Sequence, residues 1–154
     1  MTIFNSMNTS ASALTAQRLR MDVVSSNMAN AETTRGQLVN GEWQPYRRKM
    51  VSFSPHETGA NSFSKQLTQA MGRKGAIGDG VKVNRIEEDQ TPFKLVYSPN
   101  HPDADEAGYV SMPNVDPLRE MVDLMSATRS YEANVTTMNA SKNMLLKALE
   151  IGKG

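Results

Sequence analysis

The sequence predicts an α+β protein whose long N- and C-terminal α-helices pair as an antiparallel coiled coil, with a small central β-rich domain between them. Neither glycine nor proline occurs in residues 1–35 or between Pro117 and Gly152, and most of both lie in residues 36–114. Long stretches without these residues permit uninterrupted helices, whereas turns between short strands need them. The expected regions are therefore 1–35, 36–114 and 115–154.

The N-terminal helix carries a narrow apolar seam. Alternating steps of four and three residues place mostly apolar residues on one line, which is typical of a coiled coil rather than of a wide globular core face. Alanines beside this seam would let a neighbouring backbone approach closely. The positions on the seam are Ile3, Met7, Ser10, Leu14, Gln17, Met21, Val24, Met28 and Ala31.

The C-terminal helix repeats this design. Asp116 is suited to the N-cap, Pro117 to the first helical position and Gly152 to the end of the helix. The positions on its seam are Met121, Leu124, Thr128, Tyr131, Val135, Met138, Lys142, Leu145 and Leu149. A second apolar edge predicts contact with two partners and consists of Leu118, Val122, Met125 and Ile151.

One seam is a weak source of stability for helices of this length. Ordering each backbone residue costs on the order of 1–2 kcal/mol of conformational entropy, which a few buried side chains do not offset. An intramolecular helical hairpin is the simpler alternative, but we expect further protomers to cover the remaining apolar surface. The expected assembly interface consists of Met7, Leu14, Met21, Val24, Met28, Leu118, Met121, Leu124, Tyr131, Val135, Met138, Leu145 and Leu149.

Short strands are expected between the helices. Alternating or β-branched segments bounded by turn residues indicate strands, and Pro45 indicates an edge position for the first of them. Residues 98–107 are rich in turn formers and predict a hairpin loop. Residues 54–80 show no steady period, and we expect a short helix at 63–71 and a flexible run at 72–80. The expected strands are 43–53, 81–86, 93–97 and 108–112.

Charge and cysteine content exclude several functions. The chain has 17 basic and 16 acidic residues, and its formal net charge of +1 gives no general attraction to nucleic acid or anionic membranes. It has no cysteine, so disulfides, thiol catalysis and cysteine-ligated metals are excluded. No set of nucleophile, base and carboxylate can be assembled. We therefore expect no enzymatic activity, no catalytic residue, no metal and no cofactor.

Three segments carry weaker signals for binding chemistry. The turn at 101–106 has alternating carboxylates but lacks the ligand pattern of a calcium loop. The glycine run at 72–80 lacks the lysine and hydroxyl ending of a phosphate loop. Residues 47–49 are basic and lie near Trp43 and Tyr46, as single-stranded nucleic-acid binding requires. A solvated turn, a flexible loop and a charged strand edge are the preferred interpretations.

No segment indicates a secretory signal or membrane insertion. The N-terminal residues lack a basic start followed by a continuous apolar stretch. No apolar run approaches the roughly 20 residues of a membrane helix. By itself this predicts a soluble, cytoplasmic chain.

Small residues and asparagines cluster at residues 25–34, where the first helix is expected to end. Asn27 and Asn30 can bond to backbone groups left unpaired at a helix terminus. Ala29 and Ala31 leave room for another chain. A simple helix cap is the alternative, although it explains one asparagine better than two.

The same stretch resembles the N-terminal signature of bacterial flagellar rod and hook proteins, Ser-Asn-x-Ala-Asn-x-x-Thr. Residues 95–105, 108–115, 120–134 and 144–149 are similar to basal-body rod proteins of that family. The resemblance covers nearly the whole chain except residues 54–80, an insertion longer than is usual in the family. The matched motif residues are Ser26, Asn27, Ala29, Asn30, Thr33, Pro113, Asn114, Tyr131, Glu132, Ala133 and Asn134.

The resemblance implies a structural subunit of the proximal rod, which carries motor torque across the periplasm toward the hook. It implies terminal helices paired in an inner coiled-coil layer with the β region outside. The implied partners are copies of the chain, other rod proteins and the flagellar type III export apparatus. Export without a cleaved signal would then place the chain in the basal body.

A second class of function stays open. A regulatory or adaptor protein would dock its helices on one partner instead of forming a tube. A fixed heterodimer would indicate the adaptor, whereas larger assemblies would indicate the rod subunit.

Overall fold

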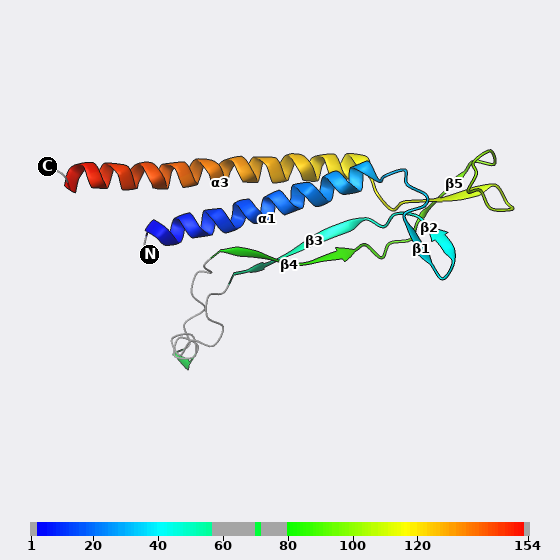
Figure 1. The fold of residues 1–154 in the computed structure, drawn as a ribbon, viewed down its shortest axis with the longest axis horizontal. Coiled ribbons are helices and arrows are strands. Elements are labelled where there is room, and N and C mark those ends of the chain that lie inside the picture. The colour runs from blue at the N-terminus through cyan, green and yellow to red at the C-terminus, as the bar shows by residue number, and fades with distance from the viewer. Residues whose placement is uncertain (1–2, 57–69, 72–79, 153–154) are drawn as a thin grey trace. The chain divides into compact units, whose positions relative to one another are not determined.

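The computed structural model describes residues 3–56, 70–71 and 80–152, and within these ranges the chain forms two long α-helices and three two-stranded β-sheets (Figure 1). Helix α1 spans Ile3–Ala29 and helix α3 spans Pro117–Gly152. The predicted mixed α+β class is therefore confirmed. The expected short helix at 63–71 lies almost entirely outside the described residues, and the expected flexible run at 72–80 lies outside them up to its last residue.

The sheets are hairpin-sized. Strands β1 and β2 pair antiparallel, as do β5 and β6, and β3 pairs with β4. The predicted strands at 81–86, 93–97 and 108–112 are confirmed as β4, β5 and β6, and the predicted hairpin loop joins the last two. The strand bounds are β1 Gln37–Val39, β2 Glu42–Gln44, β3 Lys49–Pro55, β4 Val81–Glu88, β5 Lys94–Tyr97 and β6 Tyr109–Met112.

The single strand predicted at 43–53 is wrong, because the structure divides it into β2 and β3. Pro45 has no N–H for a ladder, and the next backbone groups bond elsewhere. The Tyr46 N–H donates to the Thr33 carbonyl at 3.1 Å, and the Arg48 N–H donates to Asn114 Oδ1 at 2.8 Å. A strand cannot continue through residues whose backbone groups are used in this way.

Strand β1 was not predicted. Its partner β2 follows a tight turn in which Asn40 and Gly41 have φ values of 54° and 89°. Positive φ at both central residues is the geometry that an Asn-Gly pair adopts most readily between antiparallel strands. The Asn-Gly dipeptide was therefore the signal that could have revealed this hairpin.

Helix α1 ends at Ala29, earlier than the expected limit of residue 35. The Asn30 side-chain amide donates to the Ser26 carbonyl at 2.8 Å and closes the last turn. Beyond it, the Gly36 N–H donates to the Gln44 carbonyl at 2.9 Å. The chain after Ala29 is thus held against the β1–β2 hairpin instead of continuing the helix.

The predicted start of the C-terminal helix is confirmed, and the helix continues to Gly152, where the described residues end. Asp116 Oδ1 accepts a hydrogen bond from the Leu118 N–H at 3.1 Å, which is the geometry of an N-cap. Pro117 is the first helical residue, where its missing N–H costs nothing. Gly152 is the last.

The chain divides into two compact units, and each contains parts of both helices. Unit 1 consists of the described residues of 1–18, 53–84 and 129–154, and unit 2 consists of 19–52 and 85–128. In unit 1, the hydroxyl oxygens of Ser6 in α1 and Ser141 in α3 lie 3.4 Å apart. In unit 2, a guanidinium nitrogen of Arg20 in α1 lies 2.8 Å from Asp123 Oδ1 in α3.

The buried apolar residues of the described chain are all small. They include alanines and valines but no leucine, isoleucine, methionine or aromatic residue. The largest fully buried side chain is instead that of Glu120, and Asn27 is also fully buried. Helix and strand segments therefore meet closely over small and polar side chains. The buried apolar residues are Ala16, Val23, Val24, Val110, Val115 and Ala127.

Gly80 tests the close approach of backbone and helix in unit 1. Its φ of 140° is strained for any other residue, and an added Cβ would overlap Ser12 Oγ. We expect Gly80→Ala to lower the free energy of unfolding by about 2–3 kcal/mol, as measured by urea denaturation of the full chain. Gly152→Ala is the matched control, because a Cβ there meets nothing within 4 Å. Equal unfolding midpoints for the two variants would contradict this account.

Candidate assembly interface

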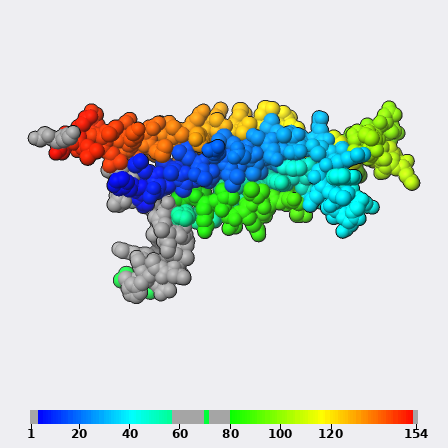
Figure 2. Space-filling model, viewed as in Figure 1, coloured from blue at the N-terminus to red at the C-terminus, as the bar shows by residue number. Residues whose placement is uncertain are grey.

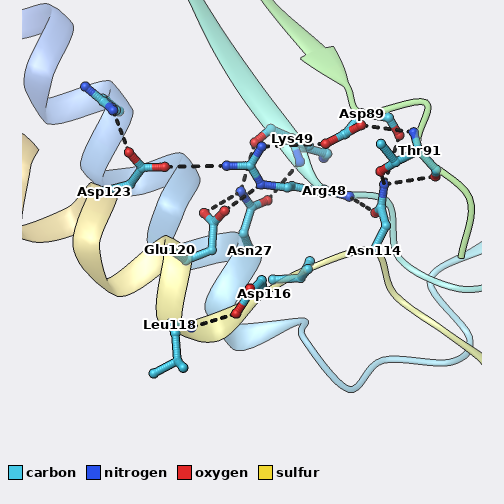
Figure 3. Close-up of polar contacts among 12 residues, drawn as sticks. Asn27, Arg48, Lys49, Asp89, Thr91, Asn114, Asp116, Leu118, Glu120 and Asp123 are labelled. Carbon is cyan, nitrogen blue, oxygen red and sulfur yellow. Dashed lines mark hydrogen bonds and ion pairs between the residues drawn. The ribbon is translucent and has the colours of Figure 1, made fainter. Parts of the chain in front are cut away.

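Unit 2 contains a buried polar cluster where the end of α1, the start of β3 and the start of α3 meet (Figure 3). Arg48 lies at its centre. Its Nε donates to Glu120 Oε1 at 2.6 Å, and its two terminal nitrogens lie 3.6 Å from Asp89 and 3.5 Å from Asp123. Because Glu120 is 0% exposed, its charge depends on these partners for compensation.

Asn27 joins the three elements through every bonding position of its amide. Its Nδ2 donates to Glu120 Oε2 at 2.9 Å and to the Lys49 carbonyl at 2.8 Å. Its Oδ1 accepts from the Lys49 N–H at 2.9 Å and from the Tyr46 hydroxyl at 3.0 Å. The side chain is 1% exposed, so no bonding capacity is left for water.

The two asparagines of the 25–34 stretch therefore have different roles. Asn30 bonds to the backbone of the last turn, as expected for a residue at a helix terminus. Asn27 instead bonds across to a strand and to the other helix, so the expected capping role does not describe it. The difference arises because Asn27 lies one turn earlier, where the helix backbone is already paired.

Asn114 ties the segment before α3 to the same cluster. Its Oδ1 accepts from the Arg48 N–H at 2.8 Å, and its Nδ2 donates to the Asp89 carbonyl at 3.0 Å. A further bond at 2.9 Å reaches the Thr91 hydroxyl. One motif residue thus holds both the start of β3 and the segment that follows β4.

Opposite charges nearly balance in this cluster. Arg48 and Arg20 face the carboxylates of Glu120, Asp89 and Asp123. The pKa of Asp89 lies below its ordinary value of 3.8, first because the Thr91 N–H donates to its carboxylate and also because Arg48 is near. The cluster has the chemistry of a structural lock, since each charge is used to bind another part of the fold.

The structure places the expected interface residues in three environments. Val24 is buried, whereas Leu118, Met121 and Leu149 are exposed. The half-buried residues are Met7, Leu14, Met21, Met28, Leu124, Tyr131, Val135, Met138 and Leu145.

Among the remaining motif residues, only Pro113 is buried. Thr33 bonds through its hydroxyl to Asn30 Oδ1 at 3.3 Å, and Asn134 donates to the Ser130 carbonyl at 2.8 Å. Ser26, Ala29, Glu132 and Ala133 are exposed. Most of the motif therefore acts locally, and Asn27 and Asn114 are the members that connect distant segments.

The basic run at 47–49 is used within the fold. The Arg47 guanidinium lies 4.4 Å from the centre of the Phe93 ring, and Lys49 lies 5.8 Å from that of Tyr46. Arg48 is the centre of the buried cluster. Arg48 is therefore used inside the fold and Arg47 is half-buried against Phe93, whereas the Lys49 side chain stays exposed.

The acidic turn at 101–106 is also occupied by internal bonds. Asp103 accepts bonds from Arg35 Nε at 2.7 Å and from the Thr34 hydroxyl at 2.8 Å, and these two bonds, that of Arg35 first, hold the pKa of Asp103 below its ordinary value of 3.8. Asp105 accepts from the Tyr109 N–H at 2.7 Å. In the described part of the chain, no three potential ligands gather around a metal position, and no helix is long and apolar enough to cross a membrane.

Sequence reasoning missed the buried cluster: it considered Arg48 only as part of the basic run at 47–49 and did not single out Asp89 or Asp123. Arg48 and Glu120 are 72 positions apart in the sequence, so no local pattern connects them. The available signal was that Glu120 opens one of the segments resembling rod proteins. A carboxylate inside such a segment, on the first turn of a helix, was a candidate for a structural role.

Comparison with known proteins defines the class of this chain. Residues 7–36 match the family described as "Flagella basal body rod protein". Residues 106–151 match the family described as "Flagellar basal body rod FlgEFG protein C-terminal". Both matches concern rod proteins of the flagellar basal body, and they cover most of α1 and α3.

Relatives that match along their whole length narrow the class. The flagellar basal-body rod protein FlgC of Bacillus subtilis is 65% identical over 153 residues, which cover 99% of this chain and 100% of the relative. FlgC of Borreliella burgdorferi is 44% identical over 158 residues, covering 100% of both chains. FlgC of Salmonella typhimurium is 44% identical over 153 residues, covering 99% and 100%. The chain therefore belongs to the FlgC family of flagellar basal-body rod proteins.

Glu120→Gln tests whether the cluster stabilises unit 2. The change keeps the shape of the side chain but removes the charge that faces Arg48. We expect the free energy of unfolding to fall by about 3 kcal/mol, because breaking a buried ion pair strands its partner. Glu150→Gln removes a largely exposed pair with Lys147 and should cost at most about 0.5 kcal/mol. Similar losses in both variants would show that the cluster contributes nothing special.

The ionised carboxylate of Asp89 should make the free energy of unfolding sensitive to acid. Because its pKa is lower in the folded chain than in the unfolded chain, its contribution to stability is present above its ordinary pKa of 3.8 and is lost as the pH falls through the folded value. Asp89→Asn should therefore destabilise the chain near neutral pH. Urea unfolding of both chains should show this gap narrowing between about pH 5 and about pH 2. A constant gap over that range would rule out the charge of Asp89 as the cause.

Proposed function

We propose that this chain is a structural subunit of the flagellar proximal rod, in the part of the basal body that spans the periplasm. It assembles with copies of itself and with other rod proteins into the shaft that transmits motor torque. It has no catalytic role and needs no cofactor. The family to which it belongs supports this proposal along the full chain.

One structural observation carries the proposal: small apolar side chains fill the interior of the described chain, whereas many large apolar side chains are exposed. Among the described residues, the buried apolar side chains are alanines and valines, while the leucine, methionine and tyrosine side chains are half-buried or exposed. Contiguous exposed apolar surface on a soluble chain marks a surface that another molecule covers. A chain with this distribution is suited to assembly rather than to life as a monomer.

The two terminal helices pair as an antiparallel coiled coil in this proposal. Within unit 2, Asn27 of α1 bonds to Glu120 of α3, whereas Met21 lies 3.6 Å from Thr128. A lower residue number in α1 is thus paired with a higher residue number in α3, as expected of two antiparallel helices. The apolar edges left outside this pair would contact neighbouring subunits.

Export by the flagellar type III apparatus completes the proposal. The resemblance to axial proteins implies this route, in which subunits pass through the growing structure. A chain without cysteine forms no disulfide that could block unfolded passage through a narrow channel.

Substitution on the helix seam tests assembly in cells. Leu14→Asp and Leu145→Asp each place a charge on a half-buried seam position, and each should abolish swimming in soft agar and the recovery of the chain in basal bodies. Asn143→Asp is the matched control, because Asn143 is exposed and lies on α3, as Leu145 does. The chain has one tryptophan, Trp43 in β2, so unchanged fluorescence of the purified variants would show that the surroundings of Trp43 in the β1–β2 hairpin are unaltered. Normal swimming by both seam variants would refute the proposal.

A further inference from the structure

The β5–β6 hairpin lies at the surface of the space-filling view (Figure 2), and one of its faces carries exposed apolar side chains. The register pairs Leu95 with Ser111 and Tyr97 with Tyr109, which puts these four side chains on one face. All of them are exposed, and Tyr97 has 65% of its surface accessible. The opposite face is anchored, because Val110 is buried. We call the outward residues Leu95, Tyr97 and Tyr109 the hairpin face.

The hairpin face is held in one geometry although it is exposed. The two tyrosine rings pack edge to face, with centres 5.3 Å apart at 65°. Gly108 adopts a φ of 79°, and a Cβ at this position would press against the Tyr97 ring at 3.0 Å. Lys94 Nζ also bonds to the Val115 carbonyl at 3.0 Å and fixes the strand. Rings held in this way lose little conformational entropy when a partner covers them.

A second apolar surface follows the first turns of α3 in the same unit. It consists of positions i, i+3, i+4 and i+7 of the helix, which form a continuous stripe. Its first residue is Leu118, which has 74% of its surface exposed and points away from the buried cluster (Figure 3). We call this surface the helix edge, and it consists of Leu118, Met121, Val122 and Met125.

The charges beside the two surfaces are opposite. Arg119 lies in the first turn of α3, where the helix dipole disfavours a cation, and it has no ion pair among the described residues. Glu106 is exposed in the loop of the β5–β6 hairpin and also has no ion pair there. Arg119 and Glu106 are thus an exposed cation and an exposed anion, each beside one of the two apolar surfaces and each available to pair with a charge on another molecule.

We propose that the hairpin face of one copy of this chain docks on the helix edge of a second copy, with Glu106 of the first opposite Arg119 of the second. Tyrosine rings packed against methionine and aliphatic side chains gain sulfur–aromatic contacts as well as apolar burial. Both surfaces are exposed in the same unit, so they do not cover each other within one chain. The contact deepens the proposed function, on which it rests, because it names the two surfaces through which copies of the chain would meet.

Two different surfaces on one chain produce a particular kind of assembly. A contact between unlike surfaces leaves one of each free on the resulting dimer, so a third copy adds in the same way. Such an interface continues around a ring or along a helix rather than closing at a dimer. This is the geometry that a tubular shaft requires.

Crosslinking in cells tests the contact. The chain has no cysteine, so single cysteines can be placed at will. Two differently tagged copies, one with Leu95→Cys and one with Val122→Cys, should give a product containing both tags when a short bismaleimide is added to basal bodies. The pair Leu95→Cys and Thr136→Cys is the control, since Thr136 is exposed on α3 outside the helix edge.

Charge exchange tests the same contact without crosslinks. Arg119→Glu and Glu106→Arg should each reduce the amount of the chain in basal bodies at least severalfold. The double variant Arg119→Glu/Glu106→Arg should recover most of the loss, because it restores one opposite pair at every contact between copies. A merely structural role of either residue would give additive losses and no recovery.

The outcomes separate this inference from the proposed function. If the cysteine variants enter basal bodies but the two tags never join, or join no better than the control pair, the docking contact is overturned and the rod function stands. A product of Leu95→Cys with a different protein would also overturn the contact between copies. If the unaltered chain is absent from basal bodies, the proposed function itself fails.

Discussion

The buried contact between Arg48, Glu120 and Asn27 is the constraint on which the described structure of unit 2 depends. Three segments that are distant in the sequence meet there, and each supplies a group that the others need. An ion pair of this kind adds little stability compared with apolar packing, but separating its partners would leave the buried charge of Glu120 uncompensated. It therefore fixes which residue of α1 faces which residue of α3 and where β3 begins.

The contact between Arg48, Glu120 and Asn27 explains how unit 2 can keep its fold with so small an apolar core. A domain that relied on leucine and phenylalanine for its interior would have few such residues left for neighbours. Here the interior is held by alanine, valine and hydrogen-bonded polar groups, so the larger side chains remain on the surface. Family membership and the exposed apolar edges lead to the same conclusion, namely that the chain is a building block of an assembly.

The sequence allowed prediction of those elements whose signals are local. The start of α3 was predictable because Asp116 and Pro117 are adjacent and act on the first turn only. The division between β2 and β3 was not, because Pro45 alone does not fix it: the division also depends on Asn114, whose bond to Arg48 spans 66 positions. The polar cluster could not be predicted for the same reason. A charged residue is expected to be exposed unless its partner is known, and the partners here are adjacent only in the folded chain.

Asn27 has a consequence for which amino acids the position can accept. Aspartate has nearly the same shape, but it would lose both donated bonds and bring a second carboxylate beside Glu120. Glutamine retains the amide but adds a methylene to a side chain that is already fully buried. Serine reaches neither the strand nor the opposite helix. Complete saturation of one small amide thus makes its position chemically irreplaceable, although the residue binds no ligand and takes part in no reaction.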